Sequence, residues 1–248
     1  SATLDLSRTL DCETSDAHVV DVGGIESLLV RRFDRALDGQ GRIVRLHQED
    51  FAQALGLPAA LKYERKGTKE RRFDVAGIRR VLDATANPID ARDRFIRATF
   101  FDLMTGNVDN HAKNFAILHT ALDGIGFAPR YDLLPTRLDP NLTDELAFKI
   151  GKATTLDALT RSDLDQFLTA LGVSSAAARR RVFTRHAQSL AKGLSESFDE
   201  LARKGMKSFA DLMASNLRQL LPVLDIVVPE AAMARDAFVN RGGGWLSS

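Results

Sequence analysis

A short stretch in the middle of the chain gathers side chains that can support chemistry. Within a few residues the sequence supplies a carboxylate at Asp109, an imidazole at His111, an ammonium at Lys113 and an amide at Asn114, and a second carboxylate follows at Asp132. Phosphoryl transfer uses such a set, because an acid orients the attacking hydroxyl and oxygen ligands hold Mg²⁺ against the phosphates. The same composition is typical of a structural turn, so spacing alone leaves a turn and a site as alternatives.

The elements around these residues must bring them together. We predict a helix that begins at Pro88 and two strands, over residues 114–118 and 126–133, that are joined by a turn. Asn114 would open the first strand and Asp132 would close the second. Because the two strands of one hairpin lie side by side, we expect both side chains to converge on one point.

The rest of the chain predicts a mainly α fold with a minor β part. A hairpin is expected around Gly23 and Gly24, with strands over residues 18–22 and 28–33, and a second turn over residues 38–41. Helical periodicity dominates beyond that point. The predicted helices cover residues 48–55, 73–82, 162–171 with Ser162 as N-cap, a segment from Ser174 that Gly193 interrupts, 207–221, and a last helix from Pro229, before a loose tail at residues 242–244.

Composition excludes several classes of protein. The 248 residues carry 34 Lys+Arg against 33 Asp+Glu, and this near-neutral balance argues against a protein that works mainly by coating nucleic acid. A single cysteine, Cys12, rules out an intramolecular disulfide framework. No apolar run approaches the roughly 18 residues of a membrane span, and no signal peptide is visible. We therefore expect a soluble, cytoplasmic protein with no membrane association.

The residues from 109 to 115 form the pattern Asp-x-His-x-Lys-Asn-Phe, and residues 131–135 read Tyr-Asp-Leu-Leu-Pro. Together they resemble the catalytic core of HipA-like serine/threonine kinases, the toxins of bacterial toxin–antitoxin modules. Further blocks agree with that family in the same order, at residues 30–35, 45–51, 56–58 and 62–64. The resemblance covers about residues 16–136 by motif. It implies a protein-kinase-like C-lobe of HipA type.

The resemblance also assigns roles to the candidate residues. It implies that Asp109 is the catalytic base and that Asn114 and Asp132 bind Mg²⁺. His111 would face the transferred phosphoryl group, and Lys113 is the alternative source of positive charge there. The family's hinge, whose backbone would face the adenine of ATP, corresponds to Arg31, Arg32 and Phe33, although the family usually has an acidic residue in place of Arg31.

One part of a kinase is missing from the sequence. Kinases carry a glycine-rich loop and a phosphate-binding lysine before the hinge, whereas the first lysine here is Lys62. We therefore expect the N-lobe to be largely absent, with residues 1–47 as a remnant of N-lobe strands and hinge and residues 48–248 as the helical lobe. A fragment of a longer kinase, a split protein and a degenerate family member remain alternatives, and we expect this chain alone to be inactive.

By the resemblance, the function is transfer of the ATP γ-phosphate to a serine or threonine of a protein such as an aminoacyl-tRNA synthetase, which halts translation and induces persistence. The implied partner is a HipB-like antitoxin, a helix-turn-helix protein through which the kinase would associate with DNA. A catalytically silent module that binds the antitoxin is the alternative. A metal-dependent hydrolase that uses Asp109, His111 and Asp132 is a further candidate, with its metal poorly specified.

Two other features have modest interpretations. The basic segment 62–72 predicts either a solvated surface loop or a contact with a polyanion. The remaining histidines, His18, His47, His119 and His186, share no metal-ligand spacing in the sequence.

Overall fold

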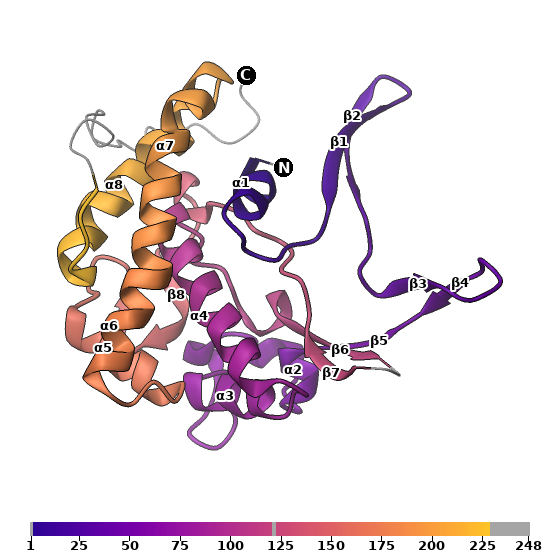
Figure 1. Ribbon diagram of the computed structural model, residues 1–248, viewed down its shortest axis with the longest axis horizontal. Coiled ribbons are helices and arrows are strands. Elements are labelled where there is room, and N and C mark those ends of the chain that lie inside the picture. Colours follow the sequence, from indigo (N-terminus) through magenta and orange to yellow (C-terminus); the bar gives the residue numbers. More distant parts are fainter. Residues whose placement is uncertain (1, 121–122, 229–248) are drawn as a thin grey trace. The chain divides into compact units, whose positions relative to one another are not determined.

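The computed structural model describes residues 2–120 and 123–228 (Figure 1). The chain divides into two compact units, one formed by Ser1–Phe95 and His111–Leu133 and the other by Ile96–Asn110 and Leu134–Ser248. We call them unit 1 and unit 2. The division falls inside helix α4 (Pro88–Thr105), which begins at the predicted Pro88. The boundary at residue 47, drawn from the family resemblance, stays a prediction.

Unit 1 begins with an unpredicted helix, α1 (Ala2–Thr9), and two hairpins. Strands β1 (Ala17–Val22) and β2 (Ile25–Val30) pair antiparallel around Gly23 and Gly24, which both have positive φ, so the predicted hairpin is confirmed. The second strand ends at Val30 and not at residue 33, because the pairing ends with Ala17 opposite Val30. Strands β3 (Arg35–Leu37) and β4 (Ile43–Arg45) form the second hairpin.

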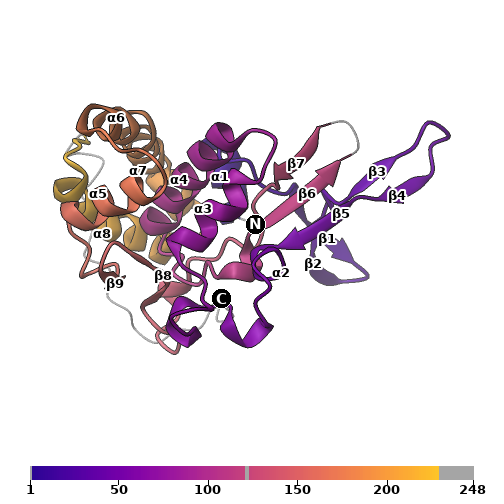
Figure 2. The ribbon, with the colours of Figure 1, turned by 90° about the horizontal axis from the view of Figure 1, so that it is seen from below.

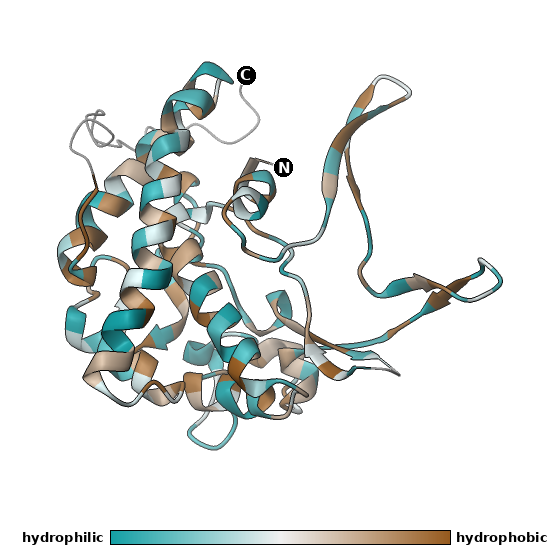
Figure 3. Ribbon diagram, in the orientation of Figure 1, coloured by the Kyte–Doolittle hydropathy of each residue, from teal (hydrophilic) through white to brown (hydrophobic). Residues whose placement is uncertain are grey.

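Both hairpins present apolar side chains to solvent. Figure 3 shows hydrophobic residues along these strands, and several of them are strongly exposed. The exposed fraction reaches 68% at Ile25, 70% at Leu37 and 74% at Ile43. The hairpins therefore contribute little to the apolar core of unit 1.

A three-stranded antiparallel sheet follows, in the order β5 (His47–Asp50), β6 (Ala116–Thr120) and β7 (Gly124–Phe127), as Figure 2 shows. The helix predicted over residues 48–55 is shorter, because residues 48–50 pair with β6 and Asp50 becomes the N-cap of α2 (Phe51–Ala54). Asp50 accepts from the backbone of Gln53, whose side chain returns a hydrogen bond to the Asp50 amide, which completes a capping box. Helix α3 (Val75–Asp83) follows.

The prediction of a strand over residues 126–133 is wrong beyond Phe127, where β7 ends. After that point the chain pairs with a different segment, since Arg130 forms a parallel bridge with Thr14. The amide of Ser15 donates to the Arg130 carbonyl at 2.7 Å, and the Arg130 amide donates to Glu13 at 2.9 Å. Asp132 therefore lies beyond the hairpin and not at its end.

A cluster of aromatic rings fills the core of unit 1 beside this sheet. The ring centroid of Phe115 lies 5.5 Å from that of Phe51 and 5.1 Å from that of Phe95, and all three side chains are buried. Phe115 directly follows Asn114, so this cluster anchors one end of the candidate site.

Unit 2 is mainly helical. Helix α5 (Arg161–Ala170) begins after Thr160, which forms a capping box with Asp163, so Ser162 is not the N-cap. Gly193 lies inside α7 and does not interrupt it; the irregular segment is a π-helix instead. The other elements are β8 (Glu145–Ile150), β9 (Ala153–Thr155), α6 (Ala176–Val182), the π-helix η5 (Phe183–Gln188), α7 (Ser189–Arg203) and α8 (Lys207–Leu224).

The expected helix from Pro229 and the tail at residues 242–244 lie outside the described residues. The sheets among the described residues are small and antiparallel, and helices form most of the regular structure. The predicted mainly α fold with a minor β part is therefore confirmed. Among the described helices, none combines the length and the apolar character that crossing a membrane requires.

Candidate active site

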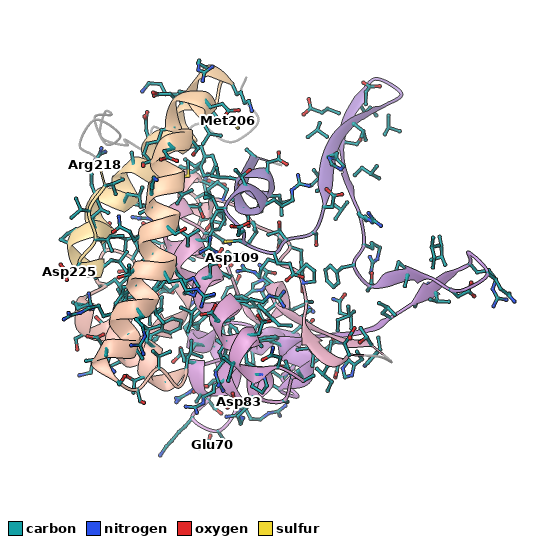
Figure 4. All side chains as sticks on the ribbon, in the orientation of Figure 1. Glu70, Asp83, Asp109, Met206, Arg218 and Asp225 are labelled. Atoms are coloured by element: carbon teal, nitrogen blue, oxygen red, sulfur yellow. The ribbon has the colours of Figure 1, made fainter. Side chains whose placement is uncertain are left out.

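The loop that carries Asp109 is fixed by a buried carboxylate in unit 2. Asp102 lies in α4 with no exposed surface, and its two oxygens accept hydrogen bonds from the side-chain amides of Asn107 and Asn110, each at 3.0 Å. The backbone amide of Asp109 donates to the Asn107 side-chain oxygen at 3.3 Å. Asp109, labelled in Figure 4, is half-buried between these two buried amides. Its carboxylate is therefore presented by a loop that is held on both sides.

A glycine allows the chain to turn from α4 into this loop. Gly106 has a φ of +79°, and a Cβ at that position would meet Asn216 Nδ2 and Leu212 Cδ2 of α8 at 3.0 Å. Further along, the Val108 amide donates to the hydroxyl of Thr136 at 3.0 Å. Only glycine combines this backbone conformation with so close an approach to α8.

In unit 1 a tyrosine links the segments that carry the two predicted metal ligands. The hydroxyl of Tyr131 donates to the backbone carbonyl of Lys113 at 2.6 Å. Tyr131 precedes Asp132 and Lys113 precedes Asn114, so this hydrogen bond holds the immediate neighbours of both ligands together. Burial raises the pKa of the Tyr131 phenol above its usual range, which keeps the hydroxyl a donor.

Two of the predicted catalytic side chains are engaged by other residues of unit 1. The exposed Lys113 donates from its ammonium to Asp50, the N-cap of α2, at 2.7 Å. The buried His111 has its Nε2 atom 2.7 Å from Nζ of Lys62. The Lys62 carbonyl also accepts from the amide of Ala112 at 3.0 Å. The segment that follows Asp109 is thus clamped from two sides.

Asp132 has an unusual backbone conformation. Its φ of 56° is left-handed, which only Asp11 and Asp225 share among the described non-glycine residues. Such a conformation costs on the order of 1–3 kcal/mol and is found at active sites more often than elsewhere. The Asp132 side chain is exposed, whereas Asn114 is buried at the end of the 3-10 helix Ala112–Asn114.

The predicted hinge residues also lie in unit 1. The Arg31 amide donates to the Asp16 carbonyl at 2.7 Å, and its side chain is exposed. Arg32 binds both carboxylate oxygens of Asp34, at 2.8 and 2.6 Å, and the hydrogen bonds from Arg32 lower the pKa of Asp34 despite its burial. The ring of Phe33 packs against that of Tyr131 with centroids 5.8 Å apart. Phe33 therefore contacts the residue next to Asp132.

The donor atoms of the predicted metal ligands suit magnesium. Asp132 offers carboxylate oxygens and Asn114 an amide oxygen, and Mg²⁺ binds through a few such oxygens together with substrate phosphates and water. Neither residue supplies the nitrogen or sulfur that a softer metal would prefer. The residues present therefore fit the ion that the resemblance implies.

Sequence reasoning missed the residues that position the site. Asp102 was a detectable signal, because it interrupts the apolar run of residues 100–104 in a predicted helix. Tyr131 was noticed only as part of the Tyr-Asp-Leu-Leu-Pro block. Its bond to Lys113 depends on where the chain runs after β7, which local periodicity does not report.

Comparison with known proteins identifies the family. The sequence profile of the HipA-like C-terminal domain matches residues 1–195. The chain belongs to this family. The serine/threonine-protein kinase toxin HipA of Shewanella oneidensis is 31% identical to this HipA-like domain over 181 residues, which cover 69% of this chain and 41% of that protein. The Sinorhizobium fredii protein Y4mE is 33% identical over 219 residues, covering 86% of this chain and 51% of the relative. The chain thus spans about half the length, or less, of these curated relatives.

Solved structures support the fold. HipA in the complex of Shewanella oneidensis HipA, HipB and operator DNA matches with a TM-score of 0.72 and 24% identity, over 95% of this chain and 57% of that one. The Helicobacter pylori proinflammatory kinase CtkA matches with a TM-score of 0.50 and 12% identity, over 90% and 82% of the two chains. At such identities the likeness shows the fold alone. The predicted kinase-like C-lobe of HipA type is confirmed.

Proposed function

We propose that this HipA-like domain carries the catalytic residues of a serine/threonine protein kinase that transfers the ATP γ-phosphate to a protein hydroxyl. The observation that carries the proposal is the loop held by Asp102, which leaves the half-buried Asp109 between two fixed amides. Phosphoryl transfer depends mainly on positioning, so a base needs a loop of this kind.

In this proposal Asp109 orients the attacking hydroxyl and accepts its proton. Asn114 and Asp132 would hold Mg²⁺, which when bound supplies positive charge that neutralises the phosphates. Their segments are joined by the Tyr131 hydroxyl at the Lys113 carbonyl. The backbone of residues 31–33 would face the adenine, and the packing of Phe33 on Tyr131 would keep that segment near Asp132.

The roles of His111 and Lys113 are refined by their contacts. His111 lies against Lys62, and Lys113 lies against Asp50. Both contacts favour a role in fixing the segment between Asp109 and Asn114 over direct contact with the transferred phosphoryl group. For His111 an electrostatic contribution through the Lys62 ammonium remains part of the proposal.

The partners follow from the relatives. The Shewanella structure contains HipA, HipB and operator DNA. We propose that this domain likewise belongs to a bacterial toxin that binds a HipB-like antitoxin, reaches DNA through it, and acts in the cytoplasm on a protein such as an aminoacyl-tRNA synthetase to induce persistence.

The test is a radiolabelled ATP assay with Mg²⁺. It compares the chain with a fusion in which the part of Shewanella HipA left uncovered by the match precedes it. We expect little transfer by the chain itself, because no lysine precedes the hinge in its sequence, and clear transfer by the fusion.

The fusion should lose activity with Asp109→Asn or Asp132→Ala and keep it with Asp123→Asn, a matched change at an exposed turn. Activity that survives Asp109→Asn would contradict the assignment of the base. Antitoxin binding without transfer by either form would favour the silent interaction module.

A further inference from the structure

A second cluster of ligating side chains lies on the sheet of unit 1. Strands β5 and β6 pair antiparallel with His47 opposite His119, and Glu49 lies two residues after His47. Residues two apart on a strand point to the same face, and directly paired residues share it, so all three side chains lie together. We propose that His47, Glu49 and His119 form a binding site for a divalent transition-metal ion of the zinc class.

The distances within the cluster are close to those of a metal site. Nε2 of His119 lies 2.8 Å and Nε2 of His47 lies 3.9 Å from the same Glu49 oxygen. All three ligand atoms lie within 4.8 Å of one another. In a tetrahedral zinc site with bonds of roughly 2.0–2.1 Å, neighbouring donor atoms are about 3.3 Å apart. Small side-chain rotations are therefore enough to close the cluster around an ion.

The types of donor select the metal. Two imidazoles and one carboxylate suit Zn²⁺ and similar ions, whereas Mg²⁺ and Ca²⁺ prefer an all-oxygen set. Three protein ligands leave a fourth position for water. The His47 side chain is 68% exposed, which gives the ion and that water access from solvent. This site thus differs in chemistry from the oxygen ligands Asn114 and Asp132.

A metal-free explanation accounts for less of the geometry. A hydrogen bond between His119 and Glu49 would stabilise the strand pair on its own. It does not explain why a second imidazole approaches the same oxygen at 3.9 Å, beyond hydrogen-bond range, with the ring centroids 4.7 Å apart. Convergence of two nitrogens on one carboxylate oxygen is what a shared cation would produce.

The bound ion would join two strands that lead to the candidate active site. β5 ends at Asp50, the partner of Lys113, and β6 begins one residue after Phe115. A metal at His47, Glu49 and His119 would therefore stiffen the sheet from which these residues extend. The proposal does not depend on the kinase function.

The experiment titrates the metal-free chain with Co²⁺, followed by its visible absorption, and with Zn²⁺, followed by calorimetry. We expect one saturable site, the intense visible bands of a tetrahedral cobalt complex, displacement of Co²⁺ by Zn²⁺ and no displacement by Mg²⁺. Zinc should also raise the thermal midpoint by mass action.

Variants locate the site. His47→Ala, His119→Ala and Glu49→Gln should each weaken zinc binding by at least about tenfold. His18→Ala is the matched control, since His18 is another exposed histidine of unit 1 beside a carboxylate, with Nε2 3.1 Å from Asp16. If His119→Ala does not fold, the exposed His47→Ala carries the test. Absence of saturable binding, or equal binding by His47→Ala and His18→Ala, would overturn the proposal.

Discussion

Nζ of Lys62 lies 2.7 Å from Nε2 of His111, two positions after Asp109 in the chain. An ammonium can only donate, so Nε2 accepts and the imidazole carries its proton on Nδ1. The first lysine of the sequence is thus a partner of the candidate site and not a solvated charge of a basic loop. Other charges of that loop are engaged as well, since Arg71 donates to the Gly56 carbonyl at 2.6 Å and Arg72 pairs with Asp74 at 2.7 Å.

Replacing the Lys62 ammonium should disturb the segment after Asp109. We expect Lys62→Met to lower kcat/KM of the fused kinase by about 10- to 100-fold, because misplacing a catalytic segment removes positioning. Nitrogen NMR of His111 should show loss of the single Nδ1–H tautomer. Lys69→Met, an exposed change in the same loop, should leave both measurements unchanged. An unaltered tautomer in Lys62→Met would show that the contact does not orient the ring.

Removing the Asp102 carboxylate should release the loop that carries Asp109. In Asp102→Asn only one side-chain oxygen remains, so Asn107 and Asn110 cannot both keep their acceptor. We expect the free energy of unfolding in urea to fall by about 1–3 kcal/mol. Asp90→Asn, an exposed change at the start of the same helix, should alter it by less than about 0.5 kcal/mol. Equal effects of the two changes would contradict this role.

The turn after α4 should not accept a side chain. Gly106→Ala forces a Cβ against Asn216 and Leu212 at a φ of +79°, so we expect a loss of at least about 1–2 kcal/mol. Gly126→Ala is the matched control in β7, where a Cβ would meet nothing within 4 Å. Thermal unfolding of both variants measures the difference. A Gly106→Ala protein as stable as Gly126→Ala would mean that α8 yields at this point.

Asp163 should make stability depend on acidity. Burial raises its pKa, but hydrogen bonds from Thr160 and from the amides of Lys152 and Ala153 outweigh burial and leave the pKa lowered. A lowered folded-state pKa contributes stability that is present above the unfolded value of about 3.9 and is lost as the pH falls through the folded value. Asp163→Asn should therefore lower the urea midpoint at neutral pH and flatten its acid dependence. A parallel shift at every pH would contradict the linkage.

Local patterns predicted what local physics decides. Pro88 started α4, and paired glycines turned the first hairpin, because both residues restrict or permit particular backbone angles. Residues 48–50 were predicted as helix but form a strand, since pairing with β6, far away in the sequence, overrides their helical propensity. The bridge between Thr14 and Arg130 ended β7 early for the same reason.

The candidate site divides in the same way. The residue types and order of Asp109, Asn114 and Asp132 were visible in the sequence, whereas the contacts that hold their segments were not. Asp102 and Tyr131 act across the fold, through side chains whose partners only the folded chain brings near. The two imidazoles of the proposed zinc site were likewise unrelated until strand pairing placed them opposite each other.

The apolar hairpins at the start of unit 1 have a practical consequence for anyone who purifies this chain. Two-stranded ribbons are marginal on their own, and each has edges with unpaired backbone groups that can template further strands. With Ile25, Leu37 and Ile43 facing water, copies of the chain should adhere through these edges as concentration rises. Ile43→Lys would act as a gatekeeper, and light scattering should show that it delays self-association without changing the melting of the helices.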